Sequence, residues 1–250
     1  NFSFKGKSVM VMNASSSSGK RMAMLFVKAG AHVAVTDPDD ISGQKVANDA
    51  CAGGGVAIFE RCDPSNPGQV QSVTKAVSSR FHALDTVVNI VNAAPEQHGE
   101  LLDDSSIFAS STTAQVRNIS SCLTCQAAHM AQNPLGGSII VLRESSSFVV
   151  SPHFDQALAD LVRAAAGEYK QQNIRHVPLM WRSRMWMLIF ARINVVLESH
   201  RPSTFLSHEQ RSDTDALRDS AKSCLWLASA AASYVTGSVI SPDSGYAYAS

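Results

Sequence analysis

Residues 7–37, KSVMVMNASSSSGKRMAMLFVKAGAHVAVTD, decide the fold of this chain. An apolar strand at 7–13 leads into a Ser-rich turn, and residues 32–36 form a second apolar strand that ends at Asp37. Between the two strands, apolar residues recur at every third or fourth position, which is the spacing of one helix face, before Gly30 closes the helix. These apolar residues are Met22, Leu25, Phe26 and Ala29. The stretch therefore predicts a β-α-β unit.

The same alternation of strand and helix continues through the rest of the chain. Further strands are expected at 56–60, 85–91, 139–142, 174–179 and 237–240, and further helices at 42–51, 66–81, 106–131, around 157–165 and at 213–231. Strands that alternate with helices of this length indicate a parallel sheet with helices on both faces. We expect a doubly wound α/β fold of about seven strands. One domain should span residues 1–250.

Composition limits the partners that this chain can have. It has 250 residues, of which 45% are hydrophobic, enough to bury one large core. Lys plus Arg and Asp plus Glu number 21 each, and a formal charge of +0 argues against nucleic acid or an anionic membrane as the main partner. We see no long uncharged apolar run, no signal-peptide core and no disulfide framework in the five cysteines. We therefore expect a cytoplasmic protein that binds a small molecule.

A second stretch, GGSIIVLRESSSFVVSPHFDQALADLVRAAAGEY at 136–169, is where chemistry is expected. It contains an apolar strand, a polar Ser-rich turn and a helix with one apolar face. A strand that feeds a helix through a polar turn places side chains at the carboxyl edge of a sheet. Open α/β folds bind their ligands at that edge.

These strings resemble the short-chain dehydrogenase/reductase family over nearly the whole chain. Residues 5–37 are similar to that family's first strand, glycine turn, helix and second strand, and residues 225–245, LWLASAAASYVTGSVISPDSG, to its last helix and strand. The helix ALADLVRAAAGEY at 157–169 is similar to its active-site helix. The resemblance implies a Rossmann-like fold. It also implies a homodimer or homotetramer with contacts through the long helix at 106–131.

By this resemblance, the three glycines of the family's coenzyme turn fall at Asn13, Ser17 and Gly19. Asn can adopt positive φ and Gly19 keeps its helix-packing role, but a side chain at Ser17 intrudes where phosphate would approach. Asp37 stands where the family binds the adenosine ribose, which favours NAD over NADP, and Asp63 matches its adenine-side aspartate. An ordinary strand-end or helix-capping role is the alternative for both aspartates.

The family's catalytic set of Asn, Ser, Tyr and Lys is only partly matched. Asn118 matches the asparagine, whereas Glu144 stands at the serine, Ser151 at the tyrosine and Asp155 at the lysine. The Pro-Gly pair that supports the nicotinamide falls on Trp181-Arg182. These departures coincide on one site. They predict that hydride transfer by the family mechanism is lost and that no cofactor is used, NAD or NADP remaining the alternative.

The residues that remain predict acid–base chemistry at the same edge. We expect Asp155, His153 and Glu144 to converge there, because a carboxylate in an apolar pocket can act as a general acid or base while a neighbouring His relays protons. Asp155 and His153 also suit a plain helix start, in which Ser151-Pro152 supplies the N-cap and first residue.

A large apolar surface is expected beside these groups. Trp181 and Trp186 lie in a Met-rich segment, and Arg182 adds a cation that can stack or bind an anion. The segment is interpreted either as a core or dimer helix or as a lid over a hydrophobic substrate. Ser146, in the polar turn, is a further candidate for substrate contact.

The leading hypothesis from the sequence is a cofactor-independent cyclase, isomerase or lyase acting on a hydrophobic small molecule, in natural-product biosynthesis. An NAD(P)-dependent oxidoreductase with atypical catalytic residues is the second hypothesis, and a non-catalytic subunit that pairs with an active relative is the third. Cys122, Cys125 and His129 share one helical face, but a closed structural zinc site takes four ligands, so no metal is expected.

Overall fold

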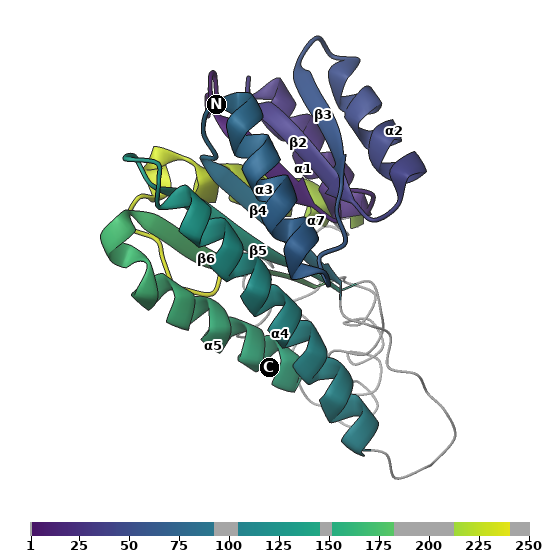
Figure 1. Cartoon of the computed structure of the whole chain (residues 1–250). Coiled ribbons are helices and arrows are strands. Elements are labelled where there is room, and N and C mark those ends of the chain that lie inside the picture. The colour runs from purple at the N-terminus through teal and green to yellow at the C-terminus, as the bar shows by residue number, and fades with distance from the viewer. Residues whose placement is uncertain (1, 93–104, 146–151, 183–212, 241–250) are drawn as a thin grey trace, which may run out of the picture.

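The computed structural model describes residues 2–92, 105–145, 152–182 and 213–240. These residues form a parallel six-stranded sheet in the order β3-β2-β1-β4-β5-β6 (Figure 1). The strands are β1 (Ser8–Met12), β2 (His32–Asp37), β3 (Val56–Arg61), β4 (Thr86–Asn92), β5 (Gly137–Ser145) and β6 (Ile174–Arg182).

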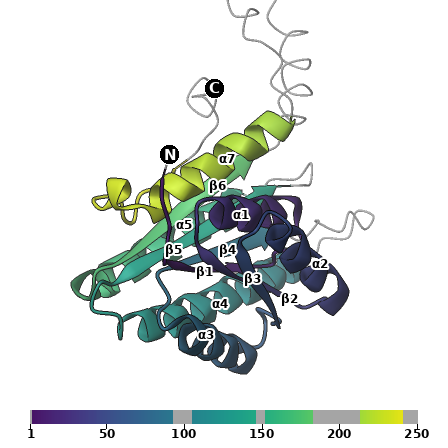
Figure 2. The ribbon, with the colours of Figure 1, turned by 90° about the horizontal axis from the view of Figure 1, so that it is seen from above.

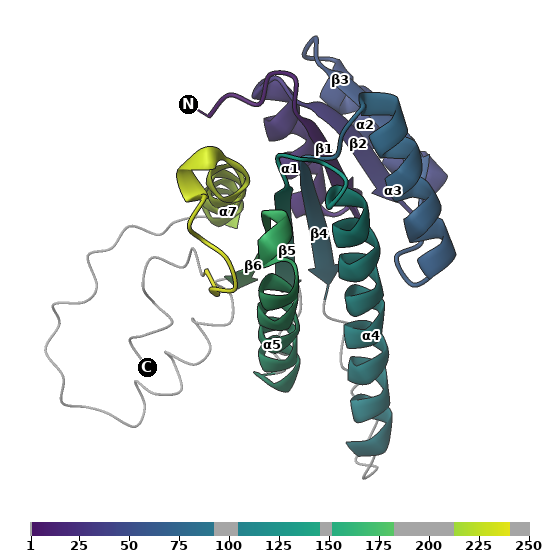
Figure 3. The same ribbon diagram turned by 60° about the vertical axis from the view of Figure 1, so that its left-hand side comes forward.

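Helices cover both faces of this sheet, as Figures 2 and 3 show. One face carries α1 (Ser17–Lys28), α2 (Asp40–Cys51) and α7 (Asp213–Ala228). The other face carries α3 (Pro67–Phe81), α4 (Ser105–Met130) and α5 (Pro152–Glu168). Two short 3-10 helices, η1 (Lys170–Gln172) and η2 (Ala230–Ala232), follow α5 and α7.

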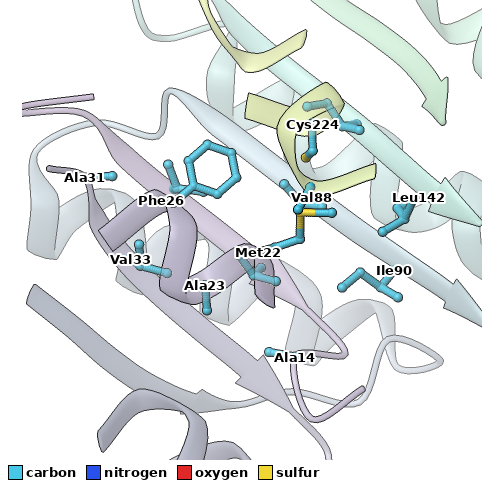
Figure 4. Close-up of a cluster of buried hydrophobic side chains, with 14 of the residues drawn as sticks. Ala14, Met22, Ala23, Phe26, Ala31, Val33, Val88, Ile90, Leu142 and Cys224 are labelled. Atoms are coloured by element: carbon cyan, nitrogen blue, oxygen red, sulfur yellow. The ribbon is translucent and has the colours of Figure 1, made fainter. Parts of the chain in front are cut away.

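The alternation of side chains along each strand divides the core into two apolar layers. In β1, Val9 and Val11 belong to the layer under α1, whereas Met10 and Met12 belong to the layer under α3 and α4. A slip of one residue would turn each apolar set to the wrong face, so the two layers fix the register. Figure 4 shows part of the first layer, with Met22, Phe26, Val88, Leu142 and Cys224.

The strand order reverses between β1 and β4. The two strands pair in parallel from Val9↔Thr86 to Met12↔Asn89. The helix that follows β1 lies on one face of the sheet, while α4, the next helix after β4, lies on the other. In doubly wound sheets ligands bind at such a reversal, outside the carboxyl ends of the two strands. We call this position, at the carboxyl ends of β1 and β4, the crevice.

The doubly wound parallel fold is confirmed, with one small difference in strand count. The described residues contain six strands, against the expectation of about seven. The seventh was expected at 237–240, and this segment does lie beside β6: the Ile240 amide donates to the Pro178 carbonyl (3.0 Å), and Leu179 and Ile240 form a single parallel bridge. In the described part of the chain, no helix combines the length and apolar character needed to cross a membrane.

Candidate functional site

The turn between β1 and α1 forms although two of its expected glycines are replaced. Asn13 adopts the left-handed backbone, with φ of 55°, as expected for an Asn that stands in for glycine. Its side-chain amide donates to the Ile90 carbonyl at the end of β4 (2.8 Å). Gly19 is required for packing, because a Cβ at this position would lie 2.6 Å from the Cα of Ala14.

The start of α1 offers polar groups to the crevice. Ser16 is the N-cap, and its hydroxyl accepts from the Gly19 amide (3.0 Å). Ser17 is the exposed first residue of the helix, and the first turn contains no acidic residue. Because a helix N-terminus carries partial positive charge, this end of α1 favours an anion such as a phosphate.

Asp37 ends β2 beside this turn and is 3% exposed. Its carboxylate accepts from the Ser15 amide (2.9 Å) and from the Asp39 amide (3.1 Å). Each carboxylate oxygen has a second lone pair, so two amide bonds leave capacity to accept hydroxyl groups of a sugar. Asp37 therefore organises the turn, and its carboxylate keeps lone pairs that could accept further hydrogen bonds.

Asp63 follows β3 and acts in a local turn. The Ser65 hydroxyl (2.7 Å) and the Ser65 amide (2.8 Å) both donate to its Oδ1. These two bonds hold the pKa of Asp63 below its usual value. The second oxygen of this carboxylate is the group that could accept a hydrogen bond from an adenine.

A buried amide pair lies beneath the crevice. Asn89 of β4 and Gln126 of α4 exchange two hydrogen bonds of 2.8 Å each, and the Gln126 amide also donates to the sulfur of Met12 (2.9 Å). Gln126 is fully buried. This pair ties α4 to the two strands that border the crevice. Asn118, half-buried, lies on the same helix about two turns earlier.

Two carboxylates occupy the end of β5 and the start of α5. Glu144 is 6% exposed, and its Oε2 has no hydrogen-bond partner among the described residues. Asp155 forms an ion pair with Arg143, whose side chain is 1% exposed (Nε to Oδ1, 2.7 Å). Alternation along β5 places Glu144 on the face of Leu142, opposite Arg143. Asp155 therefore contacts Arg143 on one face of the sheet, whereas Glu144 faces the other side. The structure does not bring the two carboxylates together as expected.

For the remaining candidate residues, we give only their positions along the helices and strands. His153 lies in the first turn of α5, directly after Pro152. Trp181 and Arg182 are the last residues of β6, and Trp181 pairs in register with Glu144. Three further candidates, Ser146, Ser151 and Trp186, lie outside the described residues.

Two residues of this region were not singled out from the sequence. Arg143 interrupts an apolar strand two residues after the buried Val141, and an acidic residue lies in the first turn of the following helix. An Arg within a buried strand signals a charge that needs a partner, but it does not identify that partner. Gln126 occupies a core position of α4, and its sequence context carries no comparable signal.

Comparisons with known proteins give consistent results. A family model described as "Enoyl-(Acyl carrier protein) reductase" matches residues 13–247. A 2,5-dichloro-2,5-cyclohexadiene-1,4-diol dehydrogenase from Sphingobium indicum is 31% identical, covering 96% of this chain and 97% of that protein. A 3beta-hydroxysteroid dehydrogenase from Mediterraneibacter gnavus is 26% identical, covering 97% of this chain and 95% of that protein.

Solved structures show the same likeness. A short-chain type dehydrogenase/reductase from Mycobacterium marinum superposes with a TM-score of 0.79 at 26% identity, covering 98% of this chain and 96% of that one. A 7 alpha-hydroxysteroid dehydrogenase complexed with NADH and 7-oxo glycochenodeoxycholic acid has a TM-score of 0.70 at 20% identity, covering 96% of this chain and 93% of that one. The second likeness concerns the fold alone.

These matches correct two expectations from the sequence. The family model and the curated relatives named above are reductases and dehydrogenases, so the expected cofactor-independent cyclase, isomerase or lyase is wrong. The expectation of no cofactor is wrong for the same reason, and a neighbour of the same fold holds NADH. The expectation rested on the joint loss of two turn glycines, the Tyr-Lys pair and the Pro-Gly pair, and the first of these losses does not destroy the coenzyme turn. In the structure, Asn13 and Gly19 still form the turn.

Proposed function

Because this chain belongs to the short-chain dehydrogenase/reductase family, we propose that it is an NAD(H)-dependent oxidoreductase for a ring-borne secondary alcohol or its ketone. The observation that carries the proposal is the intact β1–α1 turn beside Asp37. Family membership alone supports the broader conclusion that this chain is an oxidoreductase. The choice of NAD, the substrate class and the residue roles are proposed.

The coenzyme site is assigned to groups that the fold brings together at the crevice. Asp37 would accept hydrogen bonds from the adenosine ribose, and its negative charge disfavours the extra phosphate of NADP. The N-terminus of α1, with Ser17 at its start, would face the pyrophosphate. When bound, the nicotinamide supplies the hydride acceptor or donor of the reaction.

The substrate class follows from the relatives. One is named for a cyclohexadienediol and another for a 3beta-hydroxysteroid, so both names describe a hydroxyl group on a hydrophobic ring. The apolar segment that begins at Trp181 supports a substrate of this kind, with Arg182, Ser146 and Trp186 as proposed contacts.

We assign the proton step to Glu144. Oxidation of an alcohol breaks one C–H bond and one O–H bond. A bound NAD would take up the hydride, and the proton needs an acceptor from the protein. Glu144 is buried and has one oxygen without a partner among the described residues, whereas Asp155 is already engaged by Arg143. Asn118 and His153, which lie on the helices α4 and α5 of the other face, are proposed to orient the substrate hydroxyl from that side of the sheet edge, and Ser151 is proposed to assist them.

Turnover tests this assignment. The purified protein is incubated with NAD and a panel of cyclic secondary alcohols, and NADH formation is followed by absorbance. We expect turnover that falls by about a hundredfold or more in Glu144→Gln, since a positioned acid–base group contributes at least that much. NADH affinity should not change.

Glu168→Gln is the matched control, because this glutamate is exposed and ends α5 at the opposite edge of the sheet. Undiminished turnover in Glu144→Gln would refute the role of Glu144. NADH binding without turnover on any alcohol or ketone would instead favour a non-catalytic subunit.

A further inference from the structure

We propose that Asn13 is a positioning residue that clasps the coenzyme turn to β4 across the crevice. This inference rests on the proposed coenzyme site. The family's glycine at this position has no side chain, so the clasp is a property of this chain. It would hold the turn in its binding conformation before coenzyme arrives.

The clasp spans the point where the strand order reverses. Asn13 follows Met12, which is paired with Asn89. The side-chain amide of Asn13 donates to the carbonyl of Ile90 (2.8 Å). The bond therefore continues the β1–β4 pairing by one side-chain link beyond the last pair of residues. It does so at the carboxyl edge, where the crevice opens.

The turn is held from its other side by β2. The Ala14 amide donates to the Thr36 carbonyl (3.1 Å), and the Ser15 amide donates to Asp37 (2.9 Å). With Asn13, the turn is fastened to both strands that flank β1. Without the side-chain amide of Asn13, the contacts with β2 are the ones that still hold this side of the turn among the described residues. Ordering the freed side would then oppose coenzyme binding, because immobilising a loop on association costs free energy.

The left-handed backbone makes a clean substitution possible. Asn13→Gly removes the side-chain amide, and the new glycine suits the φ of 55° because it adopts positive φ without steric cost. Asn173→Gly is the matched control, since Asn173 has φ of 56° and is exposed beyond η1, at the other edge of the sheet. Both variants make the same chemical change at a left-handed Asn.

NADH affinity is measured by calorimetry and NADH release by stopped-flow fluorescence. We expect Asn13→Gly to weaken NADH binding about fivefold, the worth of one ordinary hydrogen bond, chiefly through faster release. Asn173→Gly should bind NADH like the wild type. Amide hydrogen exchange in the coenzyme-free protein should also speed up at residues 14–20 in Asn13→Gly alone.

Equal or tighter NADH binding by Asn13→Gly would overturn the clasp. A wild-type protein that does not bind NADH would refute the proposed function instead. In that case the hydrogen-exchange comparison decides the clasp, and unchanged exchange at residues 14–20 overturns it.

Discussion

Among single residues, Gln126 should be sensitive even to a substitution of similar size and shape, because its side chain pairs with that of the buried Asn89. Gln126→Met fills the same space but removes two hydrogen bonds from the buried Asn89 amide. We expect a loss of about 1–3 kcal/mol in the free energy of unfolding, because an unsatisfied buried polar group costs that much. Urea unfolding followed by circular dichroism measures it.

The paired substitution Asn89→Leu with Gln126→Met provides the control. Replacing both partners by apolar groups of the same shape is nearly neutral, so we expect the double variant to recover most of the lost stability. Additive losses in the double variant would show that the two amides act separately.

His176 predicts how stability changes with pH. The ring is fully buried on β6 and packs against Tyr169 at 5.7 Å, and burial lowers the pKa of His176 from 6.5 to about 4. As pH falls through this window, the unfolded chain binds a proton that the folded chain does not. Stability should therefore fall with pH, by up to about 1.4 kcal/mol per unit.

The test compares urea unfolding of the wild type and His176→Phe at about pH 7 and about pH 5, on either side of the ordinary histidine pKa. Phenylalanine keeps the ring and cannot take up a proton. We expect a shallower loss of stability in the variant at the lower pH. The same loss in both proteins would contradict the assignment to His176.

At the element scale, the Arg143–Asp155 ion pair joins β5 to α5. Asp155→Asn removes one negative charge that contacts a guanidinium that is 1% exposed, whereas Arg143→Met removes the guanidinium from a carboxylate that is 26% exposed. We expect Asp155→Asn to cost about 3 kcal/mol of unfolding free energy and Arg143→Met to cost less, because a partly exposed charge is better hydrated. Thermal and urea melts of both variants test the order, and the reverse order would contradict it.

The elements were predictable to different degrees. Periodicity located the strands and helices closely, and α4 runs from Ser105 to Met130 against an expectation of 106–131. The left-handed turn at Asn13 followed from the known tolerance of Asn for positive φ. The pairing of Arg143 with Asp155 did not follow, because each residue alone suits another role and only the packing of α5 on β5 brings them together.

The candidate site was less predictable than the fold. Position-by-position alignment identified Glu144 and Asp155 as replacements, but it could not show that they face opposite sides of β5. It also overestimated the loss of two turn glycines, because the hydrogen bonds that rebuild the turn involve the backbones of Thr36 and Ile90, far away in the sequence.

At the scale of the whole molecule, we expect a homodimer or homotetramer that uses α4 and α5. The two helices lie side by side on one face of the sheet (Figure 3). Light scattering coupled to gel filtration should give two or four times the 26.7 kDa of one chain. Ala128→Glu, which places a charge on the exposed face of α4, should shift the protein towards monomer.

Lys45→Glu is the control for this shift, because Lys45 is exposed on α2, on the other face of the sheet. A monomeric wild type would contradict the expected assembly. An oligomer that Ala128→Glu leaves intact would place the interface elsewhere.

A calorimetric titration with NADH and NADPH decides whether this chain binds a nicotinamide coenzyme and which one it prefers. We expect saturable NADH binding, accompanied by a melting shift that rises with ligand concentration. NADPH should bind more weakly, because its additional phosphate meets the Asp37 carboxylate. Absence of binding by either nucleotide at millimolar concentration would contradict the account.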